Sequence, residues 1–246
     1  MDKNSSLEAV GLKKMYGKKM VVKGVDIKLN KGEIVGLLGP NGAGKTTSFY
    51  MLAGIIKPTG GSVILKGVDV TKLPMYKRSR MGLGYLPQEA SVFRKLTVEQ
   101  NIMAILETIE KDKNIRNEKL EFFLNELSIT HIRKSMGYSL SGGERRRVEI
   151  TRSLVSNPDF ILLDEPFAGV DPVTIESIQK IIFELKDKNI GVLITDHNVQ
   201  ETLKITDRAY LLFDGKIMTE GDSFDLSNNP EARKLYFGEN FRLNRD

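Results

Sequence analysis

The stretch from Gly39 to Thr46 has residue types and a spacing that suit phosphate binding. Glycines let backbone N–H groups converge on phosphate oxygens, the helix expected after them adds partial positive charge, and Lys45 can neutralise the β and γ phosphates. We expect the Thr46 hydroxyl to bind Mg²⁺ and Thr47 to belong to the same site. The pattern G-x-x-x-x-G-K-[ST] is matched by Gly39, Pro40, Asn41, Gly42, Ala43, Gly44, Lys45 and Thr46.

Two adjacent acids end an apolar run further along the chain. Residues 160–163 read Phe-Ile-Leu-Leu, and Asp164 and Glu165 follow them. A carboxylate at the end of a buried strand beside a phosphate loop is the Walker B arrangement, so we expect Asp164 to hold Mg²⁺. Neighbouring residues of an extended segment point in different directions. Glu165 is therefore predicted to face an attacking water and act as the catalytic base.

The elements that must position these residues predict an α/β domain with a mostly parallel core sheet. Apolar runs bounded by polar residues indicate buried strands at 33–38, 160–163 and 191–194. A helix is expected from Lys45 through Leu52. Segments 21–29 and 62–68 are interpreted as strands of a smaller antiparallel layer.

The middle of the chain predicts a helical insertion. Thr97 and Gln100 fit a capping box, and Leu120, Phe123, Leu124 and Leu127 form a helical apolar stripe. We expect one domain over residues 1–246. Its nucleotide-binding core is predicted at about 1–89 and 157–246, and its helical subdomain at about 90–156.

A third motif narrows the class of protein. Residues Leu140, Ser141, Gly142, Gly143 and Glu144 resemble the signature motif of ABC-type ATPases. Gln88 upstream and His197 downstream complete the order of motifs found in that family. The resemblance covers essentially the whole chain. It implies the P-loop NTPase fold of ABC type, with ATP and Mg²⁺ as cofactors.

The resemblance also implies roles for residues outside the phosphate loop. Tyr16 resembles the aromatic that stacks on adenine, and Gln88 the glutamine that reaches Mg²⁺ and the attacking water. The metal ligands implied are thus Thr46, Gln88 and Asp164. Ser141, Gly142 and Gly143 begin a helix and are expected to bind the γ-phosphate of an ATP held by a second copy of the chain.

Two further residues have alternative interpretations. His197 resembles the catalytic histidine that contacts the γ-phosphate and orients the nucleophile with Glu165; a lone histidine is otherwise more often a packing or surface residue. Asp171 resembles the family residue that communicates across the dimer interface. It also suits the N-cap of a helix that begins with Pro172.

The amino-acid composition limits which classes of protein remain possible. The 246 residues are 40% hydrophobic and 28% charged, which excludes disordered and collagen-like chains. No run approaches the roughly 18 apolar residues of a membrane span, and no apolar run follows the N-terminus as in a signal peptide. The absence of cysteine excludes disulfides and thiolate metal sites.

The net charge of +5 permits nucleic acid, an anionic membrane or a polyphosphate as partner. The run Arg145–Arg147 is interpreted as a solvated or interface face of a helix. About fifty residues separate Gln88 from Ser141, without sustained heptads, so the long coiled coil of ABC-type DNA-repair ATPases is absent. We therefore expect no nucleic-acid partner.

Outside the catalytic motifs, the sequence resembles ATPase subunits of bacterial lipopolysaccharide exporters. The segment 84–94 and the tail 236–243 carry this resemblance. It implies transmembrane permease subunits as partners, contacted near Phe93 and Phe241, and peripheral association with the cytoplasmic face of the inner membrane. Two alternatives stay open: the ATPase of another transporter, such as a branched-chain amino acid importer, and an ABC ATPase of a cytosolic assembly system.

Overall fold

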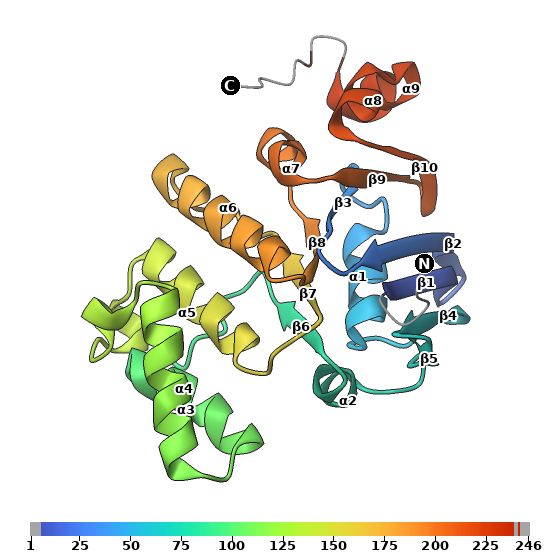
Figure 1. The fold of residues 1–246 in the computed structure, drawn as a ribbon. Coiled ribbons are helices and arrows are strands. Elements are labelled where there is room, and N and C mark those ends of the chain that lie inside the picture. Colours follow the sequence, from blue (N-terminus) through green and yellow to red (C-terminus); the bar gives the residue numbers. More distant parts are fainter. Residues whose placement is uncertain (1–5, 239–240, 242–246) are drawn as a thin grey trace.

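Two β-sheets enclose the first helix, and the remaining helices surround them (Figure 1). The computed structural model describes residues 6–238 and residue 241. The larger sheet has the strand order β10-β9-β3-β8-β7-β6, in which only the β10–β9 pair is antiparallel. Its strands are β3 (Ile34–Leu38), β6 (Leu83–Leu86), β7 (Phe160–Asp164), β8 (Gly191–Thr195), β9 (Arg208–Phe213) and β10 (Lys216–Gly221).

The predicted core strands are confirmed. Every residue of β3, β7 and β8 is buried, as expected of central strands covered on both faces. The register pairs Asp164 with Thr195 at the carboxyl ends of β7 and β8. Because β3 lies beside β8, the loop after β3 reaches the same edge of the sheet.

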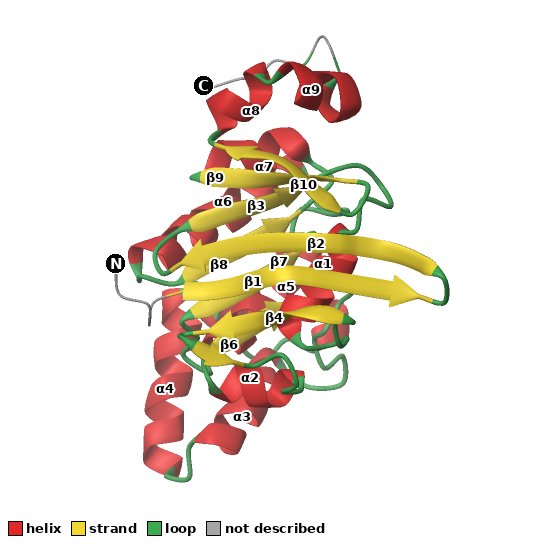
Figure 2. Ribbon diagram, turned by 90° about the vertical axis from the view of Figure 1, so that its right-hand side faces the viewer, coloured by secondary structure: helices red, strands yellow, loops and turns green. Residues whose placement is uncertain are grey.

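The smaller sheet is antiparallel and lies in front of α1 in Figure 2. Its order is β2-β1-β4-β5, with β1 (Ser6–Tyr16), β2 (Lys19–Asn30), β4 (Gly60–Leu65) and β5 (Val68–Asp69). The predicted strand at 62–68 is interrupted, because Lys66 and Gly67 have φ values of 52° and 77° and form a turn.

Helix α1 (Lys45–Ala53) begins directly after the phosphate loop and packs between the sheets. Gly44 is its N-cap in the left-handed conformation. Phe49, Met51 and Leu52 are fully buried in a cluster with residues of both sheets. The loop is thereby attached to a rigid core element.

The segment between β6 and β7 is helical. It contains α3 (Val98–Ile109), α4 (Lys113–Glu126), the 3₁₀ turns η1 (Thr130–Ile132) and η2 (Gly137–Ser139), and α5 (Gly142–Leu154). The capping box of Thr97 and Gln100 is present. Leu120 and Leu124 are buried in a separate apolar cluster of this segment, which agrees with the predicted stripe.

The other helices flank the larger sheet. They are α2 (Met75–Arg80), α6 (Pro172–Asp187), α7 (Val199–Ile205), α8 (Ser223–Asn228), α9 (Pro230–Ala232) and a π-helical turn, η3 (Arg233–Phe237). Helix α6 buries an apolar stripe of Ile175, Ile178, Ile182 and Leu185 against the sheet.

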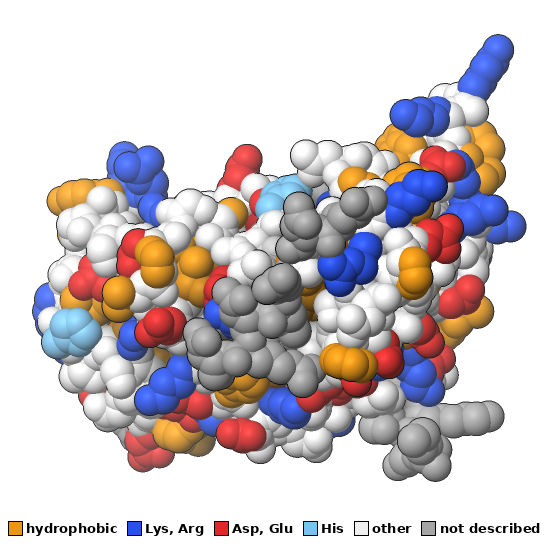
Figure 3. Space-filling view, turned by 90° about the horizontal axis from the view of Figure 1, so that it is seen from above, with side chains coloured by type: hydrophobic (Ala, Val, Ile, Leu, Met, Phe, Trp, Pro, Cys, Tyr) orange, Lys and Arg blue, Asp and Glu red, His pale blue; other side chains and the backbone are white. Residues whose placement is uncertain are grey.

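Among the residues described here, no helix has the length and apolar character required to span a membrane. On the face shown in Figure 3, basic and acidic side chains are interspersed and form no continuous area of one sign.

Candidate functional site: a phosphate loop facing a glutamate and a histidine

A pocket of about 180 Å³ brings three predicted motifs together. The phosphate loop forms one wall, and Glu165 and His197 form another. Its lining residues are Val21, Asn41, Gly42, Gly44, Lys45, Thr46, Thr47, Glu165 and His197. Segments distant in the sequence meet here because β3, β7 and β8 all end at this edge of the sheet.

Lys45 is held inside the phosphate loop by backbone carbonyls. Its side chain is buried, and Nζ donates hydrogen bonds to the carbonyls of Gly39 at 2.6 Å and Pro40 at 3.1 Å. Burial lowers the pKa of the Lys45 ammonium, while the negative charge of Glu165 acts in the opposite direction. The ammonium is thus positioned at the loop before any phosphate arrives.

Gly39 explains why the loop can lie so close to the sheet. Its φ is +146°, and a Cβ on this residue would lie 2.1 Å from the carbonyl oxygen of Leu212 on β9. Only glycine fits at this close approach. The glycine at the start of the sequence motif is therefore required on steric grounds.

Glu165 is the centre of a three-residue arrangement. Its carboxylate accepts a hydrogen bond from Gln88 Nε2 at 2.7 Å, and its other oxygen lies 2.8 Å from His197 Nε2. The Glu165 side chain is 11% exposed, against 56% for that of His197. All three residues are predicted from the sequence, and the structure brings them into contact.

The backbone at Glu165 adopts a conformation that side-chain-bearing residues rarely use. Its φ is 48°, in the left-handed region. The Glu165 N–H donates to the carbonyl of Thr195 at 2.7 Å, which fixes the turn directly after β7. This turn directs consecutive acids to different places, because Asp164 stays buried in the sheet while Glu165 faces the pocket.

Asp164 is only 2% exposed, at the end of β7 directly before Glu165. Burial is the main reason why the pKa of its carboxyl is raised to about 6, and a hydrogen bond from the Tyr85 hydroxyl at 3.3 Å partly offsets this. Burial also raises the pKa of Asp196, which accepts backbone hydrogen bonds from Phe167 and Asn198. Two buried acids therefore flank Glu165.

The interpretation of the arginine run as a solvated or interface face is wrong for Arg146, which is buried. Arg146 is 7% exposed, and it donates to the carbonyl of Pro87 at 3.0 Å and to Glu149 at 3.3 Å. A longer contact of 3.4 Å reaches the carbonyl of Asp164. Arg146 thus ties helix α5 to the residues that precede Gln88 and Glu165. The neighbouring Arg145 is exposed, as expected.

Ser141, Gly142 and Gly143 lie at the start of α5, as predicted. Ser141 is the N-cap, and a capping box with Glu144 occupies the helix end. None of the three lines the pocket around Lys45. Gly142 instead lines a neighbouring hollow of about 50 Å³, together with Gln88 and Glu165.

Tyr16 and Asp171 lie outside the pocket lining. Tyr16 is 50% exposed at the end of β1, and the Lys14 ammonium lies 5.1 Å from its ring centre. Asp171 is the N-cap of α6, accepting from the Thr174 N–H at 3.0 Å, so this alternative is confirmed. Val21 lines the pocket and was missed, because an aliphatic residue in a strand carries no chemical signal.

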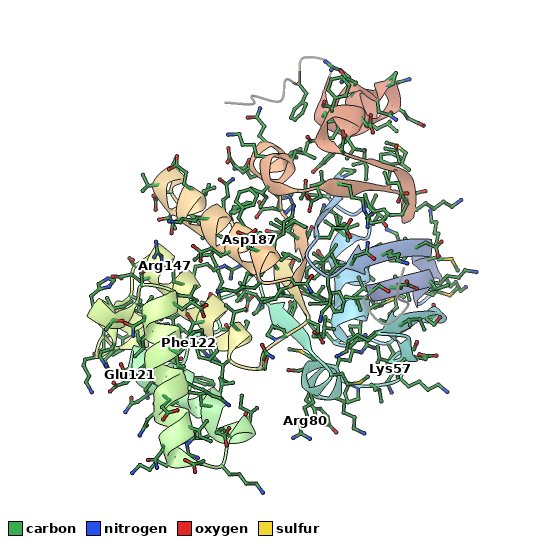
Figure 4. The ribbon with its side chains drawn as sticks, in the orientation of Figure 1. Lys57, Arg80, Glu121, Phe122, Arg147 and Asp187 are labelled. Carbon is green, nitrogen blue, oxygen red and sulfur yellow. The ribbon has the colours of Figure 1, made fainter. Side chains whose placement is uncertain are left out.

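A larger groove, of about 810 Å³, opens beside α2 and the helical segment. Figure 4 labels Arg80 on its α2 side. Pro87, Ser91 and Arg152 belong to its lining, so the groove adjoins the segment that contains Gln88. Phe93 stands next to it, 44% exposed, with the Arg152 guanidinium 4.2 Å from its ring centre.

A buried arginine joins α2, which borders this groove, to α1, the helix that follows the phosphate loop. Arg78 of α2 is 1% exposed, and its guanidinium donates to the carbonyls of Met51 and Leu52, both at 2.7 Å. These carbonyls belong to the last turn of α1, where helical partners are missing. Burial lowers the pKa of Arg78 to about 10.

The fold and the site define an ATP-binding cassette. The ABC transporter family profile matches residues 22–168. A solved ATP-binding cassette of an ABC transporter, in its ADP conformation, shares a TM-score of 0.85 and 29% identity, covering 96% of this chain and 99% of that one. The chain belongs to the ABC transporter family of ATP-binding proteins and is an ATP-hydrolysing subunit of that family.

Curated relatives match it over nearly its full length. A probable ABC transporter ATP-binding protein of Azorhizobium caulinodans is 56% identical over 97% of this chain and 85% of its own. The lipopolysaccharide export system ATP-binding protein LptB of Acidithiobacillus ferridurans is 52% identical over 96% and 98%, respectively. LptB of Escherichia coli is 50% identical over 97% and 100%.

Proposed function

We propose that this chain hydrolyses ATP to power the extraction of lipopolysaccharide from the inner membrane and its export toward the outer membrane. The observation that supports ATP hydrolysis is the single pocket in which Lys45 faces Glu165 and His197. The substrate is supported by the LptB relatives, which are 50–52% identical over almost the whole chain. Within this proposal the chain associates peripherally with the cytoplasmic face of the inner membrane.

The pocket supports a role for each phosphate-contacting group. Backbone N–H groups of the loop, Lys45 and the helix N-terminus at Thr46 and Thr47 bind the phosphates. Glu165 accepts the proton of the attacking water, and His197 contacts the γ-phosphate and holds the Glu165 carboxylate. Positioning and charge stabilisation provide most of the rate in phosphoryl transfer. Tyr16, exposed at the end of β1, offers its ring to adenine.

The oxygen donors at the pocket fit Mg²⁺. Hard cations of this size prefer carboxylate, hydroxyl and amide oxygens together with substrate phosphates. Thr46, Gln88 and Asp164 supply those three donor types. In the described part of the chain, no cluster of three or more His, Cys, Asp or Glu side chains could hold a metal by itself. A bound Mg²⁺ would neutralise phosphate charge, and it would depend on the nucleotide for most of its ligands.

A second copy of the chain completes the site in this proposal. Ser141, Gly142 and Gly143 present a helix N-terminus that suits an anion, yet they do not line the pocket of their own Lys45. Two copies closing head to tail would place this helix end over the partner's nucleotide. Asp171, at the start of α6, would then face the dimer interface.

The groove beside α2 is the proposed seat of the permease subunits. It adjoins the Gln88 segment, and Arg78 fastens its α2 wall to the helix that carries the phosphate loop. Movement in the groove is thereby linked to the nucleotide pocket. Phe93 supplies an exposed apolar contact at its edge.

Phe241 in the tail makes contacts within the chain. Its ring stacks on Phe237, with centroids 4.8 Å apart and an interplanar angle of 20°, and it packs against an internal apolar cluster. The ring is half-buried by these contacts, and the partner contact expected of Phe241 stays a prediction. The other tail residues singled out, 239–240 and 242–243, lie outside the described part.

Purification from native membranes under mild detergent tests this proposal. We expect the chain to bring down transmembrane subunits, in a complex that hydrolyses ATP faster when lipopolysaccharide is present. Membrane subunits that respond to an amino acid would instead assign another transporter. Recovery with cytosolic proteins alone would assign an assembly ATPase, and either result would overturn the proposal.

A further inference from the structure

A tight turn between β9 and β10 lies against the phosphate loop. The turn consists of Asp214 and Gly215, whose φ values of 43° and 77° are both in the left-handed region. Two-residue turns of this kind match the twist of a hairpin and favour the pair Asp-Gly. The Gly215 N–H donates a hydrogen bond at 2.9 Å to the carbonyl of Ala43, a residue of the phosphate loop. The β9–β10 turn therefore contacts the loop through backbone atoms.

The same turn is also attached to β2. The Gly215 carbonyl accepts a hydrogen bond from the Lys23 N–H at 2.8 Å. The Lys23 ammonium forms an ion pair with the Asp214 carboxylate at 2.6 Å. A Cβ on Gly215 would lie 2.4 Å from the carbonyl oxygen of Val21. The turn is thus held between β2 and the phosphate loop, with no space for a side chain at Gly215.

The hydrogen bond to Ala43 sets the direction of the next amide in the chain. In a planar trans peptide, the C=O of one residue and the N–H of the following residue point in opposite directions. Because the Ala43 carbonyl is directed at the turn, the Gly44 N–H is directed away from it, and Gly44 lines the nucleotide pocket. Backbone N–H groups at the start of a helix are donors for phosphate oxygens. One peptide unit therefore links Gly215 to an amide that is available to a phosphate.

We propose that Gly215 is a positioning residue for nucleotide binding: its N–H holds the Ala43 carbonyl and thereby keeps the Gly44 N–H directed at the phosphates. The inference rests on the binding of ATP in the pocket and is independent of what is transported. It adds the β9–β10 turn, which contains none of the predicted site residues, to the elements that form the nucleotide site.

The test places a methyl group at the close contact. Gly215→Ala introduces the Cβ that meets the Val21 carbonyl, so the turn must shift relative to β2 and the phosphate loop. Gly11→Ala is the matched control, because Gly11 of β1 has a φ of 55° and a Cβ there would meet no atom within 4 Å. Both variants place alanine in the left-handed region, and only Gly215→Ala adds a steric conflict. Full-length chains are compared by ATP titration in EDTA, by steady-state hydrolysis with Mg²⁺ and by thermal unfolding.

We expect Gly215→Ala to raise the Kd for ATP about three- to tenfold, the size of one lost hydrogen bond. Its kcat at saturating ATP should change less than its KM, because Glu165 and His197 lie on other elements. Gly11→Ala should lose thermal stability through the same backbone strain and keep the wild-type Kd. Equal Kd values for the two variants would overturn the inference.

A measurement on the wild-type chain tests the same contact without a substitution. Amide hydrogen exchange is followed in EDTA, with and without ATP, at the β9–β10 turn and at the turn formed by Lys66 and Gly67, whose φ values are also positive. Bound ATP should stabilise the Gly215–Ala43 contact and slow exchange at the β9–β10 turn at least about twofold, with no change at the other turn. Unchanged exchange at the β9–β10 turn would contradict the inference, even if Gly215→Ala failed to fold. A wild-type chain that binds no ATP would instead overturn the proposed function.

Discussion

His197 Nε2 lies 2.8 Å from Glu165 Oε1, and this contact joins the carboxyl ends of two parallel strands. The same carboxylate also receives the Gln88 amide at 2.7 Å. A water-activating group must be held in one orientation to be efficient. Here the orientation is fixed by one neighbour on each oxygen and by the left-handed backbone turn at Glu165.

Replacing Glu165 with Gln should abolish turnover and leave nucleotide binding intact. The amide retains the size and hydrogen-bonding capacity of the carboxylate but cannot accept the proton of the attacking water. We expect hydrolysis to fall at least about 100-fold, the usual contribution of a general base, with the Kd for ATP unchanged. Phosphate release and equilibrium titration measure the two quantities. Near-normal hydrolysis would remove Glu165 from this role.

Burial of the Asp164 carboxylate should lower the free energy of unfolding of the nucleotide-free chain, by an amount that depends on pH. Its pKa is raised from 3.8 to about 6, so the folded state binds the proton more tightly than the unfolded state does. The cost is absent below pH 3.8, grows as the pH rises to 6 and is constant above it, at roughly 3 kcal/mol.

Asp164→Asn should therefore be more stable than wild type at pH 7.5 in EDTA, by up to about 3 kcal/mol. The difference should vanish near pH 4. Denaturant unfolding at both pH values measures it. The exposed Asp187, labelled in Figure 4, provides the control Asp187→Asn, which should show no such pH dependence. An equal stability of Asp164→Asn and wild type at pH 7.5 would contradict the assignment.

Substitutions of Arg146 and Glu149 should have coupled effects on the stability of the chain. Arg146→Met leaves the buried Glu149 carboxylate without its guanidinium, which typically costs about 3–5 kcal/mol. Glu149 also accepts the amides of Ser91 and Val92. Adding Glu149→Gln removes the charge and keeps this acceptor.

The double variant should thus recover much of the lost free energy of unfolding. Arg145→Met, on the exposed neighbour, should change stability by less than about 0.5 kcal/mol. Additive losses from the two substitutions in a double-mutant cycle would refute a direct Arg146–Glu149 coupling.

A charged substitution of Phe93 should weaken assembly with the membrane subunits without weakening nucleotide binding. Phe93→Glu places a charge at the edge of the proposed permease groove, where desolvation opposes docking. Phe122→Glu is the matched control, since Phe122 is 57% exposed on α4 and does not line that groove (Figure 4). Co-purification of membrane subunits should fall at least about tenfold for Phe93→Glu, a cost of about 1.4 kcal/mol. Equal recovery of the two variants would exclude this groove edge.

The parts of the fold that follow local rules could be predicted from the sequence. Buried strands appear as continuous apolar runs, and the capping boxes at Thr97 and Ser141 mark where α3 and α5 begin. The phosphate loop is predictable because the close approach of Gly39 to the sheet permits only glycine at that position. The motif order then brought Glu165, Gln88 and His197 to one site.

Features that depend on distant contacts could not be predicted. Three consecutive arginines look alike, and only the spacing of three residues from Arg146 to Glu149 hints that one is buried. The packing of Tyr236 against the cluster that includes Leu38 joins segments far apart in the sequence, and no local pattern encodes it. The position of α2 beside the groove depends on hydrogen bonds from Arg78 to backbone carbonyls of α1, and backbone carbonyls carry no sequence signal.

The most direct test of the proposed function is ATP-driven movement of lipopolysaccharide. The chain and its co-purified membrane subunits are reconstituted in vesicles that contain lipopolysaccharide, and release to an acceptor is followed with wild type and with Glu165→Gln. We expect release that requires ATP and is lost in the Glu165→Gln complex. Hydrolysis by the wild-type complex without any movement of lipopolysaccharide would contradict it.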